Sequence, residues 1–292
     1  MARLFRKGAA TLIAAQLLLT SACTDIPVSR TGTGTPDPGH GRLARGGTIA
    51  VGVTTDLPGW SALTIGENSR SGFDIDLVKW LASRLDFTPN YVDLTLAQRE
   101  SALRGGADER KAHLVAAVFS ITDERRKRVM FAGPYMVTRQ GFMVRKGDTR
   151  INAMADLKGK TVCTGAGTTS LKQLKDSGIK MNVTDEQGMN ACVARLLEGK
   201  SVDAVSTDQL MLAGLAQTDP ERLEVLPDLT FGAQERYGLG LPLGDVADCE
   251  IVTKELQDFI NQGYWSQFFR QRFPGLEPDP YQPDPFNLNA CE

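Results

Sequence analysis

The sequence predicts an α/β protein with two domains in which parallel strands alternate with helices. Apolar runs such as 48–54 (TIAVGVT) and 114–118 (LVAAV) alternate with stretches whose apolar residues follow helical spacing. Such alternation favours parallel sheets, whose ligands bind beyond the carboxyl ends of the strands. A length of 292 residues with 41% hydrophobic content is sufficient for about two domains of ~100 to 200 residues each.

Charge and residue content argue against several functions. The formal net charge is −2 and the pI is about 5.8, so no basic field attracts nucleic acid. His40 and His113 are the only histidines, and the chain has no CxxC, HExxH or GxSxG pattern. We therefore expect no metal, no cofactor and no hydrolase chemistry.

The N-terminus predicts export. Residues 1–22 combine a basic start, an apolar run at 9–19 and a small-residue exit, which is the pattern of a signal peptide. The run is too short to cross a bilayer as a helix, which takes ~20 residues. Cys23 follows directly, as the lipidated cysteine does in bacterial lipoproteins, and 23–47 is expected to be a flexible tether. We expect an extracytoplasmic protein that acyl chains hold at the outer face of the cell membrane, with secretion without lipid as the alternative.

The first domain continues with a loop at 56–61 (DLPGWS) after the first strand. In 72–85 (GFDIDLVKWLASRL), strand-like alternation changes to the apolar stripe of a helix. A strand at 91–94 then leads into a helix at 97–104. The run 114–118 is consistent with a strand buried on both faces.

The segment 120–135 (SITDERRKRVMFAGPY) predicts a receptor for a carboxylate. Ser120 and Thr122 are good helix N-cap residues, and Arg125 follows within the first turn. An anion can bind where a strand end, helix amides and a guanidinium meet. The planar fork of the guanidinium contacts both oxygens of a carboxylate. The alternative is an exposed charged helix in which Arg125 pairs with solvent or a neighbouring acid.

The second domain repeats the pattern. A strand at 161–164 runs into the glycine loop 165–171 (GAGTTSL), whose backbone amides point into one cavity and which lacks the Gly-Lys pair of a phosphate-binding loop. An amphipathic helix at 188–200 precedes 201–216, which is predicted to be strand, acid and helix. The acid, Asp208, ends an apolar strand. Its one carboxylate could either cap the following helix or act as the negatively charged contact for a ligand.

The strand 237–241 (YGLGL) returns the chain to the first domain, where helices follow at 249–261 and 264–273. The two crossings, near 137–141 and 229–233, permit a hinge. The predicted boundaries are 48–139 and 232–276 for a discontinuous first lobe, 140–231 for the second lobe, and 277–292 for a proline-rich tail without regular structure.

Four cysteines remain beside Cys23, an even number in an oxidising compartment, so disulfides are expected. Three pairings are open, and we favour Cys163 with Cys192 and Cys249 with Cys291. The first would join an apolar strand to the buried stripe of a helix. The second would pin the tail.

Four segments occur in the order of a known family: 72–85, SITDER, GTTS and VDAVSTD. Together they resemble the amino-acid-binding proteins of bacterial ABC importers, whose lobes resemble the core of ionotropic glutamate receptors. The resemblance covers roughly 48–274. It implies a two-lobed, periplasmic-binding-protein-like type II fold with two crossover strands and a ligand cleft between the lobes. It also implies a monomer that binds a free amino acid and hands it to an ABC permease without catalysis.

The resemblance assigns the ligand backbone to both lobes. Ser120 and Arg125 would hold the α-carboxylate, with Thr122 beside them. The carbonyl of Val118 would face the ammonium. From the second lobe, the resemblance places Thr168 and Thr169 on the carboxylate and Asp208 on the ammonium.

Side-chain preference is expected to come from the rest of the cleft. Arg99 resembles the arginine that dicarboxylate-binding members place on the distal carboxylate, and a surface arginine is the alternative. Gln187 lies where polar side chains reach the distal group, and Asp56 and Trp60 would wall the pocket. Thr54 stands where a dicarboxylate specialist has a further arginine. Because Arg99 suits a distal carboxylate, glutamate is expected, and because the further arginine is missing at Thr54, glutamine, aspartate and asparagine are left open.

Two other functions fit the same cleft. One is a sensor whose closure a membrane partner such as a kinase pathway reads. The other is an enzyme on this scaffold, a dehydratase of cyclic acids, which needs a general acid or base in the cleft. Neither His40 nor His113 lies on a predicted cleft loop.

Overall fold

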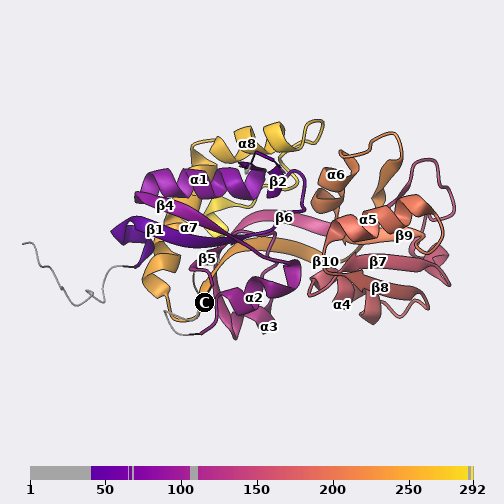
Figure 1. The fold of residues 1–292 in the computed structure, drawn as a ribbon, viewed down its shortest axis with the longest axis horizontal. Helices are drawn as coiled ribbons and strands as arrows, with labels where there is room; N and C mark the ends of the chain where they lie inside the picture. The colour runs from indigo at the N-terminus through magenta and orange to yellow at the C-terminus, as the bar shows by residue number, and fades with distance from the viewer. Residues whose placement is uncertain (1–40, 65, 68, 106–110, 289–290, 292) are drawn as a thin grey trace, which may run out of the picture. The chain divides into compact units, whose positions relative to one another are not determined.

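A computed structural model describes residues 41–64, 66–67, 69–105, 111–288 and 291 (Figure 1). The described residues all belong to one compact unit, 38–292. The predicted signal peptide, Cys23 and most of the predicted tether lie outside the described residues. Within the described part of the chain, no helix is both long enough and apolar enough to span a membrane.

Most strands of the unit 38–292 belong to one mixed sheet. Its strand order is β4-β1-β5-β10-β6-β9-β7-β8, and β2 and β3 form a separate hairpin. The strands are β1 (Gly47–Val53), β2 (Ala62–Thr64), β3 (Ser69–Ser71), β4 (Phe87–Asp93), β5 (Leu114–Val115), β6 (Val129–Arg145), β7 (Thr161–Gly165), β8 (Asn182–Glu186), β9 (Ala204–Asp208) and β10 (Leu223–Pro242).

The long strands β6 and β10 pair with each other in antiparallel orientation and connect two smaller groups of strands. Strands β4, β1 and β5 are parallel on one side, and β8, β7 and β9 are parallel on the other. We call the first group and its helices the first lobe, and the second group and its helices the second lobe. The predicted α/β class with parallel strands is confirmed.

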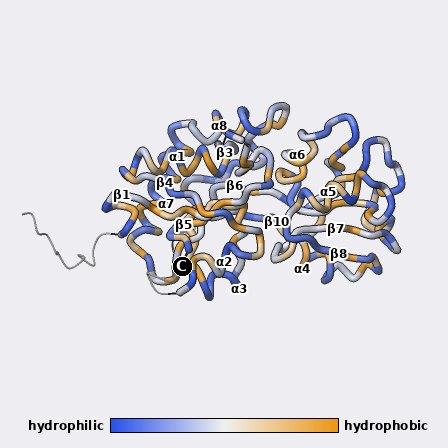
Figure 2. The backbone as a smooth tube through the Cα atoms, viewed as in Figure 1, coloured by the Kyte–Doolittle hydropathy of each residue, from blue (hydrophilic) through white to orange (hydrophobic). Residues whose placement is uncertain are grey.

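The helices cover the strands of each lobe (Figure 1). In the first lobe they are α1 (Phe73–Leu85), α2 (Arg99–Ala102), α3 (Asp123–Arg126), α7 (Val246–Asn261) and α8 (Tyr264–Arg272). In the second lobe they are α4 (Thr169–Asp176), α5 (Met189–Glu198) and α6 (Gln209–Ala216). Figure 2 shows hydrophobic residues along the central strands and hydrophilic residues on the outer turns.

Helix α1 begins earlier than the sequence pattern indicated. The alternation at its start belongs to the helix, because Phe73, Asp74 and Ile75 are all buried in its first turn. Gly72 precedes the helix with φ 131°, and a Cβ there would lie 2.2 Å from the Trp60 backbone. Only glycine fits this approach.

Two other elements are shorter than predicted. The predicted helix at 97–104 is a 3₁₀ turn, Leu96–Gln98, followed by the single turn of α2. The predicted strand at 114–118 keeps only Leu114 and Val115 in the sheet. Val118 has φ 46°, a left-handed conformation that ends any strand and is costly for a β-branched residue.

The tail is ordered beside β6. Val137 N donates to Tyr281 O at 2.9 Å, and Cys291 N donates to Phe131 O at 3.3 Å. Strand β9 reaches only residues 140–143 of β6, so the tail lies along the part of β6 that β9 leaves uncovered. Apart from a 3₁₀ turn, Pro285–Asn287, the tail has no regular structure among its described residues.

Both predicted disulfides are confirmed. Cys163 of β7 bonds to Cys192 of α5, and Cys249 of α7 bonds to Cys291 of the tail. The Cα–Cα distances are 5.5 and 5.6 Å, within the usual range. The first bond ties a strand of the second lobe to its covering helix, and the second ties the tail to the first lobe.

Candidate functional site

Arg125 connects the two lobes. Thr122 caps α3, and its hydroxyl accepts from Arg125 N at 3.2 Å. The Arg125 guanidinium donates to Ser120 O at 2.7 Å and, across the lobe junction, to Gly167 O at 3.0 Å. The predicted capped turn is confirmed. Within the described residues the guanidinium donates to carbonyls, as no acid accepts from it.

Arg99 lies beside Arg125 and is not a surface residue. Only 3% of it is exposed. Its guanidinium donates to Leu96 O at 2.7 Å, Ala117 O at 3.1 Å and Val118 O at 2.7 Å, and its Nη2 lies 3.4 Å from Gly167 O. Burial and the like charge of Arg125 lower the pKa of Arg99 to about 9.

The two guanidiniums also share one aromatic ring. Their central carbons lie 4.9 Å (Arg99) and 4.8 Å (Arg125) from the centre of the Phe119 ring. Both positive charges therefore converge near Gly167 without an acid as hydrogen-bond partner among the described residues. Buried cations in this arrangement are stabilised by an anionic ligand.

Val118 is held in its unusual conformation by buried groups. Its amide donates to Asp74 Oδ2 at 3.2 Å, and Tyr135 OH donates to Asp74 Oδ1 at 2.7 Å. Burial raises the pKa of Asp74 to about 7. The Val118 carbonyl, expected on the ligand ammonium, accepts from Arg99.

The glycine loop of the second lobe brings Thr168 and Thr169 to the junction. Thr168 caps α4, since its hydroxyl accepts from Leu171 N at 3.1 Å and donates to Gly165 O at 2.7 Å. Its hydroxyl is therefore occupied within the loop. The Thr169 hydroxyl lies 3.5 Å from the Ser120 hydroxyl of the first lobe, so of these two threonines it is Thr169 whose hydroxyl lies at the predicted carboxylate position.

Asp208 ends β9 in a buried position. Although it is the N-cap residue of α6, its side chain makes no cap hydrogen bond. Its Oδ2 accepts from Tyr237 OH, and its Oδ1 has no partner among the described residues. Burial, and then the charge of Glu235, raise the pKa of Asp208 to about 8. A buried carboxylate oxygen in this state favours a cationic donor.

The remaining predicted residues lie apart from this cluster. The Asp56 carboxylate accepts from the backbone N–H groups of Met189 and Asn190, at the start of α5. Trp60 is fully buried and donates to Leu210 O at 3.3 Å. Both residues extend from the first lobe to the second. Gln187 is exposed, and no described contact joins it to the cluster.

A polar network at the lobe junction escaped prediction. Gln140 of β6 and Glu235 of β10 are buried in the two crossover strands, and Gln173 of α4 contacts Glu235. Tyr237, two residues after Glu235, completes the contact to Asp208. The sequence signal was present, since polar side chains interrupt otherwise apolar strands. Their meeting depends on pairing between residues almost a hundred positions apart.

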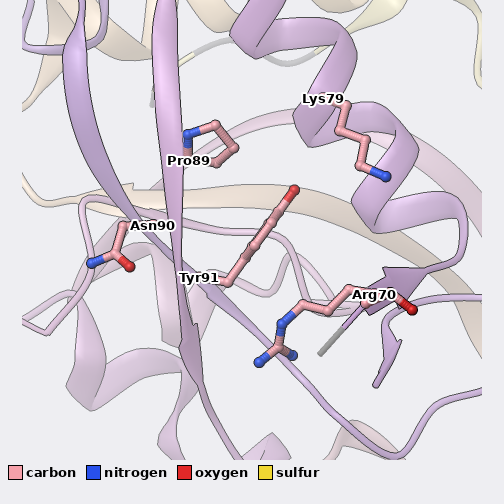
Figure 3. A pocket seen from close by; sticks show the side chains of 6 residues that line it. Arg70, Lys79, Pro89, Asn90 and Tyr91 are labelled. Atoms are coloured by element: carbon pink, nitrogen blue, oxygen red, sulfur yellow. The ribbon is translucent and has the colours of Figure 1, made fainter. Parts of the chain in front are cut away.

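Two pockets differ in their relation to this cluster. A cavity of about 210 Å³ is lined by Arg99, Arg104, Arg125, Phe119 and Gly167, among others, with Glu100 as its one acidic lining residue. A pocket of about 420 Å³ lies in the first lobe and has no lining residue in common with the cluster (Figure 3). The positive lining of the first cavity suits an anion.

Comparisons with known proteins match most of the chain. Residues 49–274 match the profile of the bacterial extracellular solute-binding proteins, family 3. The chain is 28% identical over 265 residues to the glutamate-binding protein GluB of Corynebacterium efficiens, covering 86% of this chain and 88% of the relative. It is 32% identical over 216 residues to a glutamine-binding protein of Geobacillus stearothermophilus, covering 73% of this chain and 79% of the relative.

A solved structure supports the fold. An ancestral arginine-binding protein bound to arginine has a TM-score of 0.70 and 27% identity to this chain. The match covers 77% of this chain and 98% of that one.

Proposed function

The chain belongs to the bacterial extracellular solute-binding proteins of family 3, and we propose that it captures a free amino acid between its lobes and delivers it to an ABC permease. Glutamate is the proposed ligand, and glutamine, aspartate and asparagine are its competitors. Lipid attachment at Cys23 would keep a monomer at the outer face of the membrane. The family and the relatives carry the names of binding proteins, so we assign the chain no catalytic step.

One observation carries the proposal: guanidiniums of the first lobe and a buried carboxyl group of the second lobe face a common junction. Arg125 and Arg99 of the first lobe direct N–H groups at a carbonyl of the second lobe. Asp208 of the second lobe keeps one buried carboxylate oxygen without a partner among the described residues. A zwitterion matches this set, because its carboxylate meets the guanidiniums and its ammonium meets Asp208.

A second anionic group on the ligand is supported by the number of cations. Arg125 is sufficient for the α-carboxylate, which leaves Arg99 and the positive cavity beside it for a distal carboxylate. Burying a guanidinium without a counter-charge costs several kcal/mol, so an apolar ligand side chain beside Arg99 would be disfavoured. The names of the glutamate-binding and glutamine-binding relatives agree with this ligand class.

Titration calorimetry with Arg125→Ala tests the proposal. The wild-type protein should bind glutamate, and the variant should lose at least about a hundredfold in affinity, because a charge-assisted, partly buried contact contributes roughly 3 kcal/mol or more. Arg139→Ala is the matched control, since Arg139 is an exposed arginine on β6, and it should bind as the wild type does. Retained affinity in Arg125→Ala would refute the role of Arg125.

A further inference from the structure

Glu235 organises a hydrogen-bond network across both crossover strands. Its Oε1 accepts from Gln140 Nε2 at 3.0 Å and from Gln173 Nε2 at 2.6 Å. Gln140 Nε2 also lies 3.3 Å from the Thr169 hydroxyl, and Gln140 Oε1 accepts from the Ser170 hydroxyl at 2.6 Å. The network thus joins β6 and β10 to the first turn of α4, next to the predicted carboxylate position.

The carboxylate of Glu235 fixes the orientation of both amides. An ionised carboxylate only accepts hydrogen bonds, so each glutamine must turn its NH₂ group toward it. For Gln140 this places the carbonyl on Ser170 and commits both amide hydrogens, one to Glu235 and one to Thr169. For Gln173 it leaves Oε1 buried without a partner among the described residues. An unsatisfied buried acceptor is destabilising.

The direction of these bonds determines what the Thr169 hydroxyl does. Because the Thr169 oxygen accepts from Gln140, its single hydrogen is left for another acceptor. Across the junction, the Ser120 hydroxyl lies 3.5 Å from the Thr169 hydroxyl. The Thr169 hydroxyl therefore keeps its hydrogen available for an acceptor at the junction between the lobes.

We infer that Glu235 is a positioning residue that, through Gln140, makes the Thr169 hydroxyl a donor and so selects a carboxylate at this position. This inference rests on the proposed function, since it assigns the ligand carboxylate to Thr169. A ligand with an amide in place of the α-carboxylate would offer this hydroxyl a weaker acceptor. A glutamine at position 235 would both donate and accept, and Gln140 could then reverse.

Calorimetry with L-glutamate and its α-amide tests the inference on Glu235→Gln. The wild type should prefer glutamate, and the variant should reduce the ratio of the two affinities by about tenfold or more, the factor expected from one hydrogen bond to a charged group. Asp228→Asn removes an exposed acid from the same strand and should leave the ratio unchanged. Circular dichroism would show that each variant is folded.

Two further variants test whether Glu235 acts on Thr169 through Gln140 or only stabilises the fold. Gln140→Glu places an acceptor beside the Thr169 hydroxyl in place of the amide donor and should lower the ratio as Glu235→Gln does, which keeps the test valid if Glu235→Gln does not fold. In a Thr169→Val background, Glu235→Gln should change the ratio by less than about twofold, because linked residues are non-additive. A ratio equal to that of the wild type in folded Glu235→Gln, or full additivity with Thr169→Val, would overturn the inference. A wild type that binds no amino acid would instead overturn the proposed function, and this inference with it.

Discussion

Asp208 is the residue whose ionisation most directly controls the proposed site. Its carboxylate is buried beside Glu235, and Tyr237 supplies a hydrogen bond to only one of its oxygens. With a pKa of about 8, the group is largely protonated at neutral pH. A ligand ammonium favours the ionised form, so binding must lower this pKa and release a proton.

Glutamate affinity should therefore increase with pH. Between pH 6 and 8 the dissociation constant is expected to fall by up to about tenfold per pH unit, and above pH 8 the dependence should flatten. Calorimetry in buffers of different ionisation enthalpy measures the released proton directly. Affinity that is constant from pH 6 to 8 would show that the ammonium does not bind to ionised Asp208.

The stability of the ligand-free protein should change in the opposite direction. The folded-state pKa of Asp208 lies above its unfolded value of about 4, so the folded state binds more protons between pH 4 and 8. The contribution of Asp208 to the free energy of unfolding is therefore lost as pH rises through this window. Asp208→Asn should be more stable than the wild type at pH 8, by roughly 1 to 3 kcal/mol, and little different at pH 4. Denaturant unfolding at the two pH values measures this, and equal effects at both would contradict it.

Part of this site can be predicted from the sequence. Each of its predicted residues follows the carboxyl end of a predicted strand or the start of a helix, and their elements meet at one junction; these residues are Ser120, Arg125, Thr169 and Asp208. Gln140 and Glu235 could not be predicted, because their roles arise only when β6 and β10 pair. The sequence alone does not decide whether Arg99 lies on the surface or in the cleft. The left-handed turn at Val118, which brings the Val118 carbonyl to Arg99, has no signal in the sequence.

At the scale of elements, the start of α5 links the lobes. Asp56, in the loop after β1, accepts from the first amides of this helix, where the helix dipole favours a negative charge. Gly188 allows the approach, since a Cβ there would lie 2.7 Å from Asp56 Oδ2. Asp56 is thus placed to stabilise lobe closure, a role different from the predicted contact with the ligand.

Asp56→Ala should weaken closure. Losing an acceptor at a helix N-terminus costs ~0.5 to 2 kcal/mol, so glutamate should dissociate about two- to thirtyfold faster. Stopped-flow fluorescence measures the rate. Asp185→Ala, which removes an exposed acid of β8, should leave it unchanged. A dissociation rate in Asp56→Ala that equals the wild-type rate would show that this contact does not hold the lobes together.

Elements with a strong apolar pattern were predicted well, and those fixed by distant contacts were not. Strands β1, β7 and β9 and helix α5 agree with the sequence pattern within a few residues. The single turn of α2 and the short β5 differ from the prediction, and Arg99 of α2 donates to the carbonyls of Ala117 and Val118, which follow β5 outside the sheet. The tail, predicted only to be pinned by a disulfide, also forms two backbone hydrogen bonds with β6.

For the whole molecule, the crossover strands explain how two lobes can move and still form one site. The pairing of β6 with β10 is irregular between Leu226 and Phe231, between Phe231 and Glu235, and between Tyr237 and Leu239. These shifts lie where the lobes join, so bending there disturbs few regular ladder bonds. The contacts of Arg125, Asp56 and Trp60 across the junction indicate the closed arrangement.

A crystal structure of the protein grown with glutamate is the most direct measurement. The ligand α-carboxylate is expected within hydrogen-bond distance of the Arg125 guanidinium and the Thr169 hydroxyl, with the ammonium on Asp208 Oδ1. Among the described residues, Gly167 O is the one acceptor that both arginines contact, and the ligand should then provide a second shared acceptor. Glutamate bound away from Arg125 and Asp208, or a junction without ligand at saturating glutamate, would contradict the proposed site.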